Sequence, residues 1–381
     1  MSERPLSAVV LAAGEGTRMR SSRPKPLHLL CGRAMLLYVL DSLDDVAVRE
    51  VVVVVGHGAE RVTKKLQEHG PDLLISFVEQ HVQRGTGDAV SVGLTGLPDE
   101  DGADHGPDGD GDVLVLPGDT PLLRASTIAR LVAAHRESGA ACTLLTARLP
   151  DPSGYGRVVR RPGKGDEEAR VVRIVEHGDA TDEEREIDEI NTSIYCFRRS
   201  LLAPALRRLS PDNVQGEYYL TDVVGVLHDA GYLVGAVVAD DPMETEGVND
   251  RRQLARAEAE LRRRTNDMWL GRGVTLVDPA RVVIDATVTL GTDVTLFPGV
   301  LLQGTTVVGD RAEIGPDTRL VDCVVGADAV VETTSARDSE IGAGAVVGPY
   351  AALPSGSTVP DGAVTGPFYT AGSGHDTAER P

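Results

Sequence analysis

The sequence predicts an α/β protein in which a doubly wound domain is followed by a parallel β-helix. Short β-branched runs alternate with helical patterns from Leu6 to about Ala239, and after Gly271 an apolar residue recurs at every sixth position. A glycine-containing loop also follows the first apolar run. Doubly wound sheets bind ligands beyond the carboxyl ends of their strands, so this loop is the first place where we expect a site.

The first part of the chain contains apolar runs of strand length. They are residues 6–11, 51–55, 73–78, 113–116, 142–147, 190–197 and 233–239. Helical patterns lie between them at 35–43, 59–69 and 126–138, and we expect Ser126 to cap the last of these helices. The alternation predicts a mostly parallel sheet with helices on both faces.

A six-residue repeat dominates the second part. Its apolar positions are Ile284, Leu290, Leu296, Leu302, Val308, Ile314 and Leu320. Small or β-branched residues stand two positions earlier, at Val288, Val294, Val300, Thr306, Ala312 and Thr318. The repeat shortens at Val325, recovers at Val331 and then resumes at Ile341, Val347, Leu353 and Val359. Because each hexapeptide forms one side of a triangular coil, we expect about five coils of roughly 18 residues.

These patterns divide the chain into four segments. We expect a first domain at residues 1–248, a connecting helix at 249–268, a β-helix at 269–365 and a disordered tail at 366–381. The helix is predicted by residues 250–266, which are rich in Ala, Leu, Glu and Arg and contain no Gly or Pro.

Two segments of the first domain have irregular composition. Residues 98–111 are acidic and glycine-rich, which is typical of a solvated surface loop. Residues 150–189 are charged, with short strand patterns at 156–161 and 171–176, as expected of a lid or a substrate-binding flap.

A net charge of −20 disfavours nucleic acid and anionic membranes as partners. A phosphate-bearing ligand would need a local basic site or a metal ion, which favours a small-molecule substrate. The sequence has no apolar run of membrane-spanning length and no signal-peptide core, so we expect a cytoplasmic protein. Cys31, Cys142, Cys196 and Cys323 are far apart in sequence, which indicates buried thiols, and the histidines show no metal-ligand spacing.

The loop after the first apolar run reads LAAGEGTRMRSSRPK. Gly14 and Gly16 lack the side chains that would keep a phosphate away from backbone N–H groups, while Thr17, Arg18 and Lys25 add a hydroxyl and two cations. Only four of the 38 basic residues are lysines. The presence of one of them in this loop therefore favours a site that needs a compact positive charge. The loop favours phosphoryl or nucleotidyl transfer; a tight strand-to-helix turn is the alternative.

The pattern L-x-x-G-x-G-T-R-M followed by P-K-x-L-H resembles the sugar-1-phosphate nucleotidyltransferases. Further motifs match in order and spacing: GTGDA at Gly85, LPGDTPL at Leu116, DPSGYGR at Asp151, IVEHGDAT at Ile174, EINTSIY at Glu189, QGEYYLTD at Gln215 and EGVNDR at Glu246. With the hexapeptide repeat, the chain resembles the bacterial bifunctional family that joins an N-acetylglucosamine-1-phosphate uridylyltransferase to a glucosamine-1-phosphate acetyltransferase. This resemblance implies a Rossmann-like doubly wound nucleotidyltransferase domain followed by a left-handed β-helix.

The resemblance also implies roles for individual residues. The nucleotide would be bound by Leu11, Ala12, Ala13, Gly14, Gly16, Thr17, Gln80, Gln83, Gly85 and Thr86, of which the last four would read the uracil. Gly156, Glu176 and Asn191 would hold the amino sugar, and Asp119 and Asn249 would bind Mg²⁺.

The implied reaction is an in-line attack by the oxygen of a sugar-1-phosphate on the α-phosphate of UTP, which releases pyrophosphate. Arg18 and Lys25 would be the catalytic cations, because they would offset the developing negative charge together with Mg²⁺ and the backbone N–H groups of the loop.

Taken singly, four of the implied residues have plainer interpretations. Asp119 is also suited to a turn, and Asn191 to the end of a strand. Glu176 is also suited to a surface ion pair with the adjacent His177. Asn249 precedes the connecting helix and is equally suited to capping it.

The sequence departs from the family pattern at several positions. Pro117 stands where the family has an aromatic residue, which leaves the preference for an acetamido sugar less secure. Residues 349–356 read PYAALPSG in place of PFARLRPG, and 366–372 read GPFYTAG in place of GNFVEMK, so two arginines and a lysine are missing. Family acetyltransferases have further coils and a catalytic histidine, whereas His375 is the only later histidine here.

From these departures we expect that acetyltransferase activity is lost and that a shortened β-helix serves as an assembly module in a homotrimer. Three alternatives stay open. The chain could act on another sugar phosphate or nucleotide, such as glucose-1-phosphate or dTTP, it could be a non-catalytic regulatory or scaffolding subunit, or it could be the full bifunctional enzyme.

Overall fold

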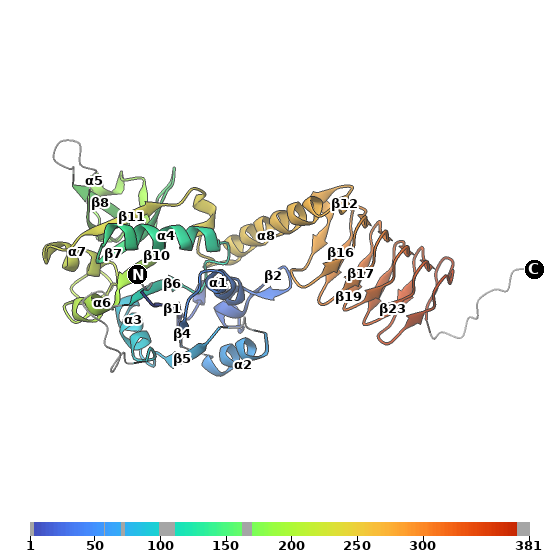
Figure 1. Cartoon of the computed structure of the whole chain (residues 1–381), viewed down its shortest axis with the longest axis horizontal. Helices are drawn as coiled ribbons and strands as arrows, with labels where there is room; N and C mark the ends of the chain where they lie inside the picture. Colours follow the sequence, from blue (N-terminus) through green and yellow to red (C-terminus); the bar gives the residue numbers. More distant parts are fainter. Residues whose placement is uncertain (1–3, 57, 70–72, 99–110, 162–169, 372–381) are drawn as a thin grey trace, which may run out of the picture. The chain divides into compact units, whose positions relative to one another are not determined.

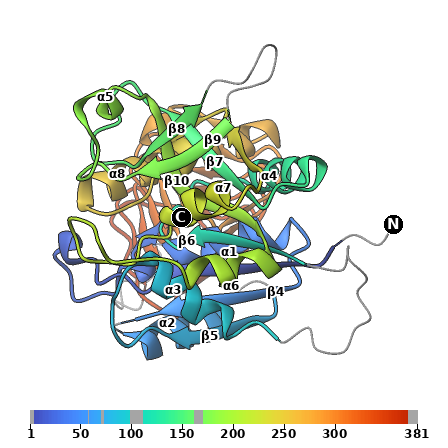
Figure 2. The same ribbon diagram turned by 90° about the vertical axis from the view of Figure 1, so that its left-hand side faces the viewer.

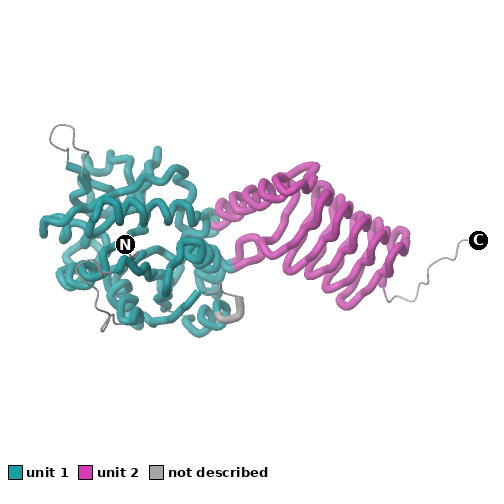
Figure 3. Tube along the Cα trace, viewed as in Figure 1, with its two compact units in different colours: residues 1–28, 34–253 teal, residues 29–33, 254–381 magenta. Residues whose placement is uncertain are grey.

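The structure is a computed structural model that describes residues 4–56, 58–69, 73–98, 111–161 and 170–371. The chain forms two compact units (Figure 3). Unit 1 comprises residues 1–28 and 34–253, and unit 2 comprises residues 29–33 and 254–381.

Three predicted features fall partly or wholly outside the described residues. The acidic insertion predicted at 98–111 is described only at its two ends. Residues 162–169 of the flap predicted at 150–189 lie outside the described residues, as do residues 372–381 of the predicted tail. The described part of the tail corrects the prediction of disorder from residue 366, because Thr370 forms a β-bridge with Ala352.

Unit 1 is built on a nine-stranded sheet whose main order is β11-β7-β10-β6-β1-β4-β5 (Figure 1). The strands are β1 (Leu6–Ala12), β4 (Glu50–Val55), β5 (Ile75–Glu79), β6 (Asp112–Pro117), β7 (Cys142–Arg148), β8 (Arg157–Arg161), β9 (Arg170–Val175), β10 (Glu189–Arg198) and β11 (Val234–Val238). Neighbouring strands along the main order are parallel, except that β10 is antiparallel to β6 and β7. The predicted mostly parallel α/β sheet is confirmed.

An antiparallel hairpin, β8–β9, joins this sheet because β8 pairs with β10 (Figure 2). It contains both short strands predicted in the flap. The strand ends differ from the predicted ones by a residue or so, because β8 begins at Arg157 and β9 ends at Val175.

The helices of unit 1 lie between the strands. They are α1 (Met35–Asp44), α2 (Ala59–His69), α3 (Thr86–Leu94), α4 (Ala125–Ser138), α5 (Asp182–Arg185), α6 (Arg199–Leu206) and α7 (Asp222–Asp229), with short 3₁₀ turns η1 (Thr17–Met19), η2 (Lys25–Leu27) and η3 (Pro242–Thr245). The small strands β2 (Leu29–Leu30) and β3 (Arg33–Ala34) pair with each other.

Alternate residues of the central strands feed two apolar clusters, one on each face of the sheet. Val10 packs in the cluster that contains apolar residues of α1, α2 and α4. Val9 packs in the cluster that contains apolar residues of α3, α6 and α7. A strand that is apolar on both faces needs cover on both, and this explains the near-continuous Val/Leu runs of the sequence.

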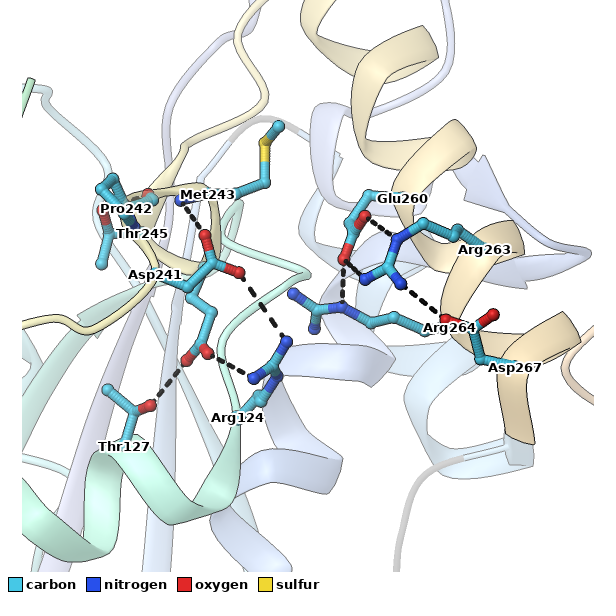
Figure 4. A network of polar contacts seen from close by, with 11 residues as sticks. Arg124, Thr127, Asp241, Pro242, Met243, Thr245, Glu260, Arg263, Arg264 and Asp267 are labelled. Carbon is cyan, nitrogen blue, oxygen red and sulfur yellow. Dashed lines mark hydrogen bonds and ion pairs between the residues drawn. The ribbon is translucent and has the colours of Figure 1, made fainter. Parts of the chain in front are cut away.

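The start of α4 corrects one prediction. Ser126 does not cap this helix; the N-cap residue is Arg124, and no side chain caps it. The first turn is secured in another way, because Thr127 donates a 2.6 Å hydrogen bond to Glu244 and Arg124 forms an ion pair with the same carboxylate (Figure 4). The expected cap was wrong because tertiary partners take its place.

Unit 2 contains most of α8 (Arg251–Gly271), the 3₁₀ turn η4 (Pro279–Arg281) and the coils. The connecting helix predicted at 249–268 begins two residues later and ends three residues later than predicted, and it buries Ala257, Leu261 and Trp269. Trp269 belongs to the apolar cluster of the coils, so the end of the helix is anchored to them.

The solvent side of α8 carries a chain of ion pairs (Figure 4). Arg263 and Arg264 both donate to Glu260, and Arg263 also donates to Asp267 at 2.6 Å. These hydrogen bonds, led by that from Arg263, hold the pKa of Glu260 at about 2.

The coils form three parallel sheets of five strands each, so the expected five coils are confirmed (Figure 1). The strands are β12 (Thr275–Leu276), β13 (Val283–Ile284), β14 (Thr289–Leu290), β15 (Thr295–Leu296), β16 (Leu301–Gln303), β17 (Val307–Val308), β18 (Glu313–Ile314), β19 (Arg319–Val321), β20 (Val324–Val325), β21 (Val330–Val331), β22 (Ser335–Arg337), β23 (Glu340–Ile341), β24 (Val346–Val347), β25 (Ala352–Leu353) and β26 (Thr358–Val359).

Every predicted hexad position is buried in one continuous cluster, as in a left-handed parallel β-helix. The repeat shortens because some turns are one residue tighter. Leu320 is followed by the next inward residue after five positions, at Val325, and the prediction missed Ala336, which fills the inward position of β22. All four cysteines are buried and free, as predicted.

Candidate active site

A cavity of about 290 Å³ lies in unit 1 at the carboxyl ends of the parallel strands β1 and β6. Its lining comes from both of these strand ends, from η2, from the segment after β5, from the start of α3, and from single residues of β10 and of the segment before α7. The lining residues are Leu11, Ala12, Ala13, Gly14, Lys25, Pro26, Gln80, Gln83, Gly85, Thr86, Ala89, Pro117, Gly118, Asp119, Ser193 and Glu217. The loop singled out in the sequence therefore does border a cavity, at the sheet edge where ligands of this architecture bind.

Lys25 lies at the centre of a polar cluster beside this cavity. Its Nζ atom donates to Oδ2 of Asp119 and, at 2.8 Å, to Oδ1 of Asn249. The same Asn249 oxygen accepts a 3.0 Å hydrogen bond from the guanidinium of Arg18. Residues from three distant parts of the chain thus bring two cations and two oxygen ligands together.

Backbone contacts explain why these residues meet. The N–H of Val248 donates to the carbonyl of Asp119 at 2.8 Å, which brings Asn249 beside the end of β6. Gly16 has a φ of +65°, and a Cβ atom there would lie 2.7 Å from Cβ of Lys25. Gly16 is therefore needed for the close packing of the lysine.

The stretch from Ala13 to Gly14 leaves open space in front of its backbone. A Cβ atom on Gly14 would meet nothing within 4 Å, so a side chain there would extend into the cavity. Gln83 donates a 2.7 Å hydrogen bond to the carbonyl of Ala13 and holds this stretch in place.

A second cavity, of about 250 Å³, adjoins the first. It is lined by Leu11, Thr86, Glu176, Ser193, Tyr195, Gln215, Glu217, Tyr219, Leu220 and Thr221. Leu11, Thr86, Ser193 and Glu217 line both cavities, so ligands in the two spaces would be in contact.

Glu176 supplies a carboxylate to the second cavity. It accepts a 3.0 Å hydrogen bond from the hydroxyl of Thr221. Burial raises the pKa of Glu176, and the nearby Asp222 and Asp179 add to the rise, although the bond from Thr221 opposes it. A carboxylate in such surroundings is suited to a ligand that can donate hydrogen bonds to it.

Gly156 and Asn191 stand next to Glu176 without lining the cavity among the described residues. A Cβ atom on Gly156 would lie 3.4 Å from both carboxylate oxygens of Glu176. The N–H of Asn191 donates to the carbonyl of Gly156 at 2.9 Å, and its side-chain amide donates to the hydroxyl of Tyr195 at 2.8 Å.

An irregularity in β10 contributes a residue that the sequence analysis missed. The register between β10 and β7 shifts between Asn191 and Ile194, and Ser193 has a φ of +61°. The bulge directs this serine to the lining of both cavities. Bulges often serve this purpose beside sites, but no periodicity in the sequence reveals one.

The structure brings most of the implied residues together and separates a few from the cavities. Gly16 and Thr17 do not line either cavity among the described residues. Further lining residues of the second cavity were not predicted from the sequence, although all of them fall inside two of its motifs, EINTSIY and QGEYYLTD. They are Ser193, Tyr195, Gln215, Glu217, Tyr219, Leu220 and Thr221.

Three of the plainer interpretations are wrong. Asn249 does not cap α8, because Asp250 accepts the bonds from the N–H groups of Arg252 and Gln253, both at 2.8 Å. Asn191 lies inside β10 rather than at a strand end. Glu176 has Thr221 as its hydrogen-bond partner in place of the adjacent histidine.

Within the described part of the chain, no three His, Cys, Asp or Glu side chains lie close enough to hold a metal ion. The Asp119 carboxylate and the Asn249 amide oxygen nevertheless converge on one positive charge, the ammonium of Lys25. Two such oxygens fit a hard divalent cation that takes its remaining ligands from phosphate and water.

None of the helices that the structure describes has the length and apolar character needed to cross a bilayer.

Comparison with known proteins gives a consistent result. A family model for MobA-like NTP transferase domains matches residues 8–223. The chain is 48% identical over 358 residues to the bifunctional protein GlmU of Streptomyces avermitilis. The matched region covers 93% of this chain and 70% of that protein.

Two further relatives carry the same name. The chain is 47% identical over 339 residues to the bifunctional protein GlmU of Thermobifida fusca, covering 89% and 68% of the two proteins. It is 43% identical over 363 residues to that of Brevibacillus brevis, covering 95% and 75%.

Proposed function

Because the chain belongs to the family of bifunctional GlmU proteins, we propose that its first unit joins UTP to N-acetylglucosamine-1-phosphate. The products would be UDP-N-acetylglucosamine and pyrophosphate. Nucleotidyl transfer to a sugar-1-phosphate is the activity of this unit; the identity of the sugar and of the base is the proposal.

The observation that carries the proposal is the pair of adjoining cavities with a cluster of two cations on one side. A nucleotidyl transfer needs two phosphorylated substrates in contact and a positive charge at the reacting phosphate. The shared lining residues, Leu11 and Thr86 among them, give the contact. Lys25 and Arg18 give the charge, in a chain whose net charge is −20.

In the first cavity, the triphosphate would lie along the open backbone from Ala13 to Gly14. Lys25 would then exchange part of its contact with Asp119 for a phosphate oxygen, and Arg18 would follow from Asn249. The uracil would lie against Gln80 and Gln83, beyond the phosphates, where amide and backbone groups can pair with its polar edge.

Mg²⁺ would be held by Asp119 and Asn249, whose oxygens fit it as described above. When bound, this ion would supply charge neutralisation on the phosphate oxygens. The residues of the chain do the remaining work by fixing the triphosphate and the two cationic side chains.

In the second cavity, the sugar would donate hydroxyl hydrogen bonds to Glu176. Gly156 keeps the carboxylate side of this cavity clear, and Asn191 supports it through the hydroxyl of Tyr195. Ser193 and Glu217, which line both cavities, stand where the sugar phosphate meets the nucleotide.

The reaction would need no covalent enzyme intermediate. An oxygen of the sugar phosphate forms a bond to the α-phosphorus of UTP as the bond between the α-phosphorus and its bridging oxygen to the β-phosphate breaks. The electron pair leaves with pyrophosphate. Lys25 and Arg18 stabilise the charge that develops on the phosphate oxygens.

A substrate panel tests the proposal. Purified protein with Mg²⁺ is given UTP or dTTP together with N-acetylglucosamine-1-phosphate or glucose-1-phosphate, and pyrophosphate release is measured. We expect the fastest release with UTP and N-acetylglucosamine-1-phosphate, and loss of activity on chelation of the metal. A preference for another pair would support the sister-enzyme alternative, and no release with any pair would support a regulatory or scaffolding subunit.

For the second unit, we propose an assembly role without acetyl transfer. Ala352 and Pro354, which replace arginines of the family pattern, are both exposed, so these coils lack two outward cations that would meet a phosphate. One sheet instead presents stacked valines, because Val330 pairs with Val346 and Val346 with Val364. Exposed apolar stacks of this kind favour contact with other copies of the chain.

Two measurements test this second proposal. Light scattering at micromolar protein is expected to give a trimer, and a monomer would contradict the assembly role. Incubation with acetyl-CoA and glucosamine-1-phosphate is expected to give no acetylated product; acetylation would instead identify the full bifunctional enzyme.

A further inference from the structure

The side-chain amide of Gln80 has a fixed orientation. Its Nε2 atom lies 2.8 Å from Oδ2 of Asp88 and 3.4 Å from the carbonyl oxygen of Gly85. A carboxylate and a carbonyl can only accept hydrogen bonds, so the group that faces them must be the NH₂ group. The acceptor Oε1 is then the polar atom that Gln80 offers to the first cavity, since no described residue donates to it.

Both partners of this amide are themselves held in place. Gly85 adopts a φ of +109° against Tyr218, and a Cβ atom on it would lie 2.6 Å from the Tyr218 carbonyl oxygen. Asp88 stands in the first turn of α3, and its Oδ1 atom pairs with the guanidinium of Arg84 at 2.9 Å. From Arg84 through Asp88 to Gln80, the hydrogen-bonding groups therefore alternate as donor, acceptor and donor up to the first cavity.

Asp88 does not line the first cavity. It lines a separate space of about 260 Å³ between α3 and α6, together with Arg84 and Tyr218. Any influence of Asp88 on a bound base must therefore pass through Gln80.

We propose that Asp88 is a positioning residue that makes the site select uracil over cytosine, because it forces Gln80 to present an acceptor to the base. Uracil carries a donor at N3, which matches Oε1, whereas cytosine carries an unprotonated acceptor at N3, which would face Oε1 without a hydrogen bond. This inference rests on the proposed function, in which Gln80 faces the base of UTP.

The substitution Asp88→Asn tests the orientation directly. Arg84 carries only donors, so the new asparagine keeps its oxygen toward Arg84 and turns its NH₂ group toward Gln80. Two NH₂ groups cannot face each other, and because the 2.8 Å contact with residue 88 outweighs the 3.4 Å contact with the Gly85 carbonyl, the Gln80 amide turns over. It then presents a donor to the cavity, which suits N3 of cytosine.

The measured quantity is the ratio of kcat/KM for UTP to kcat/KM for CTP. We expect a strong preference for UTP in the wild type, and a ratio lower by on the order of 10–100-fold in Asp88→Asn, the scale of one hydrogen bond gained or left unpaired. A purely structural role of Asp88 at the start of α3 would lower both values and leave their ratio unchanged.

Matched variants exclude other causes. Arg84→Met alone should keep the ratio, because Asp88 remains an acceptor. Arg84→Met combined with Asp88→Asn should recover much of the preference for UTP, because the asparagine is then free to turn its oxygen toward Gln80. Asp182→Asn removes one exposed charge in α5, far from this chain of contacts in sequence, and should change nothing.

Asp88→Ser gives a second route should the asparagine variant fold poorly, because a hydroxyl fixes neither orientation and should lower the ratio by a smaller factor. Thermal-shift titrations with UTP and with CTP give the same comparison without turnover. A folded Asp88→Asn protein that keeps the wild-type ratio in both assays would overturn the inference and leave the proposed function intact. A wild type that releases no pyrophosphate from UTP would overturn the proposed function, and the inference with it.

Discussion

The two units differ in whether one structural environment is repeated along the chain. In unit 2 the same environment recurs along the chain, and residues such as Ile284, Leu302 and Leu320 occupy equivalent inward positions on successive coils. In unit 1 each residue of the candidate active site occurs once. Lys25, Asp119 and Asn249, for example, belong to segments far apart in the sequence and meet only through the fold.

This difference separates stability from chemistry. Unit 2 spreads its stabilisation over many similar apolar contacts, and its few buried polar side chains, such as Thr306 and Thr318, donate hydrogen bonds to backbone carbonyls. Unit 1 concentrates a small number of polar groups, including the partly buried carboxylate of Glu176, at the edge of a sheet. That sheet is stabilised by the apolar clusters on its two faces. We therefore expect single substitutions in unit 2 to change stability, and single substitutions at the site to change activity.

The largest effect is expected for Leu302→Ala in β16. Leu302 is fully buried in the coil cluster, so its truncation should cost on the order of 2–5 kcal/mol of unfolding free energy through lost burial and a cavity. The control Val307→Ala, at a position 41% exposed, should stay within about 0.5 kcal/mol. Denaturant unfolding measures the change in stability of both variants. If Leu302→Ala also lost pyrophosphate release in native buffer, that loss would contradict the separation of stability and activity between the two units.

Lys25→Ala should lower kcat by on the order of 10²–10³ while the melting temperature stays near that of the wild type. The substitution removes the ammonium that Asp119 and Asn249 now share, so a charge that stabilises the phosphate oxygens is lost. Lys65→Ala on α2 is the matched control and should retain full turnover. Near-normal turnover of Lys25→Ala would refute the role of this lysine.

Glu176→Gln should raise the KM for the sugar-1-phosphate by on the order of 10–100-fold, because a charged acceptor becomes a neutral one. Burial raises the pKa of Glu176 in the fold above its unfolded value, so the ionised form weakens the folded state, and the penalty disappears as pH falls. The glutamine variant should therefore melt at a slightly higher temperature at neutral pH.

The pH dependence gives a second check on Glu176. Wild-type affinity for the sugar should fall as pH decreases through the raised pKa, since the protonated carboxyl is a weaker acceptor. The ratio of the KM of the variant to that of the wild type should then shrink toward low pH. A ratio that does not change with pH would count against ligand contact by this carboxylate.

The smallest effect is expected for Glu260→Gln on α8. The bonds from Arg263 and Arg264 lower the pKa of Glu260 to about 2, so its contribution is fully present above the ordinary glutamate pKa and disappears as pH falls toward 2. The pairs are near the surface, and the loss at neutral pH should stay below about 1 kcal/mol. Unfolding measured at several pH values should show a difference in unfolding free energy between Glu260→Gln and the wild type that disappears at acid pH. Glu340→Gln, at an exposed position, is the control.

The same contrast explains what the sequence could predict. Repetition made unit 2 predictable, because a position such as Leu296 recurs in an equivalent place on each coil. The two missed inward positions are Ala336, where the repeat is shortened, and Leu276, which precedes the regular repeat. In unit 1 the sheet was predictable from the apolar runs. The cap expected at Ser126 was wrong because Glu244, more than a hundred residues away, fixes that helix start.

The candidate site was predictable only where a motif carried it. Lys25 was found from the residues of its glycine-containing loop, and Asp119 because its segment matches a known pattern, although nothing local in the sequence shows that they touch. Ser193 was missed because a bulge, which leaves no periodic signal, turns it into the cavities. Glu217 was missed although its motif was recognised, since no residue of that motif had been given a role.

The central claim is that nucleotide and metal meet beside Lys25 in unit 1. A crystal structure of the chain soaked with UTP and Mn²⁺, in which the anomalous signal locates the metal, tests it most directly. The account predicts one strong metal peak between Asp119 and Asn249, with the triphosphate along Ala13 and Gly14. Metal and nucleotide bound together at any other place would contradict it.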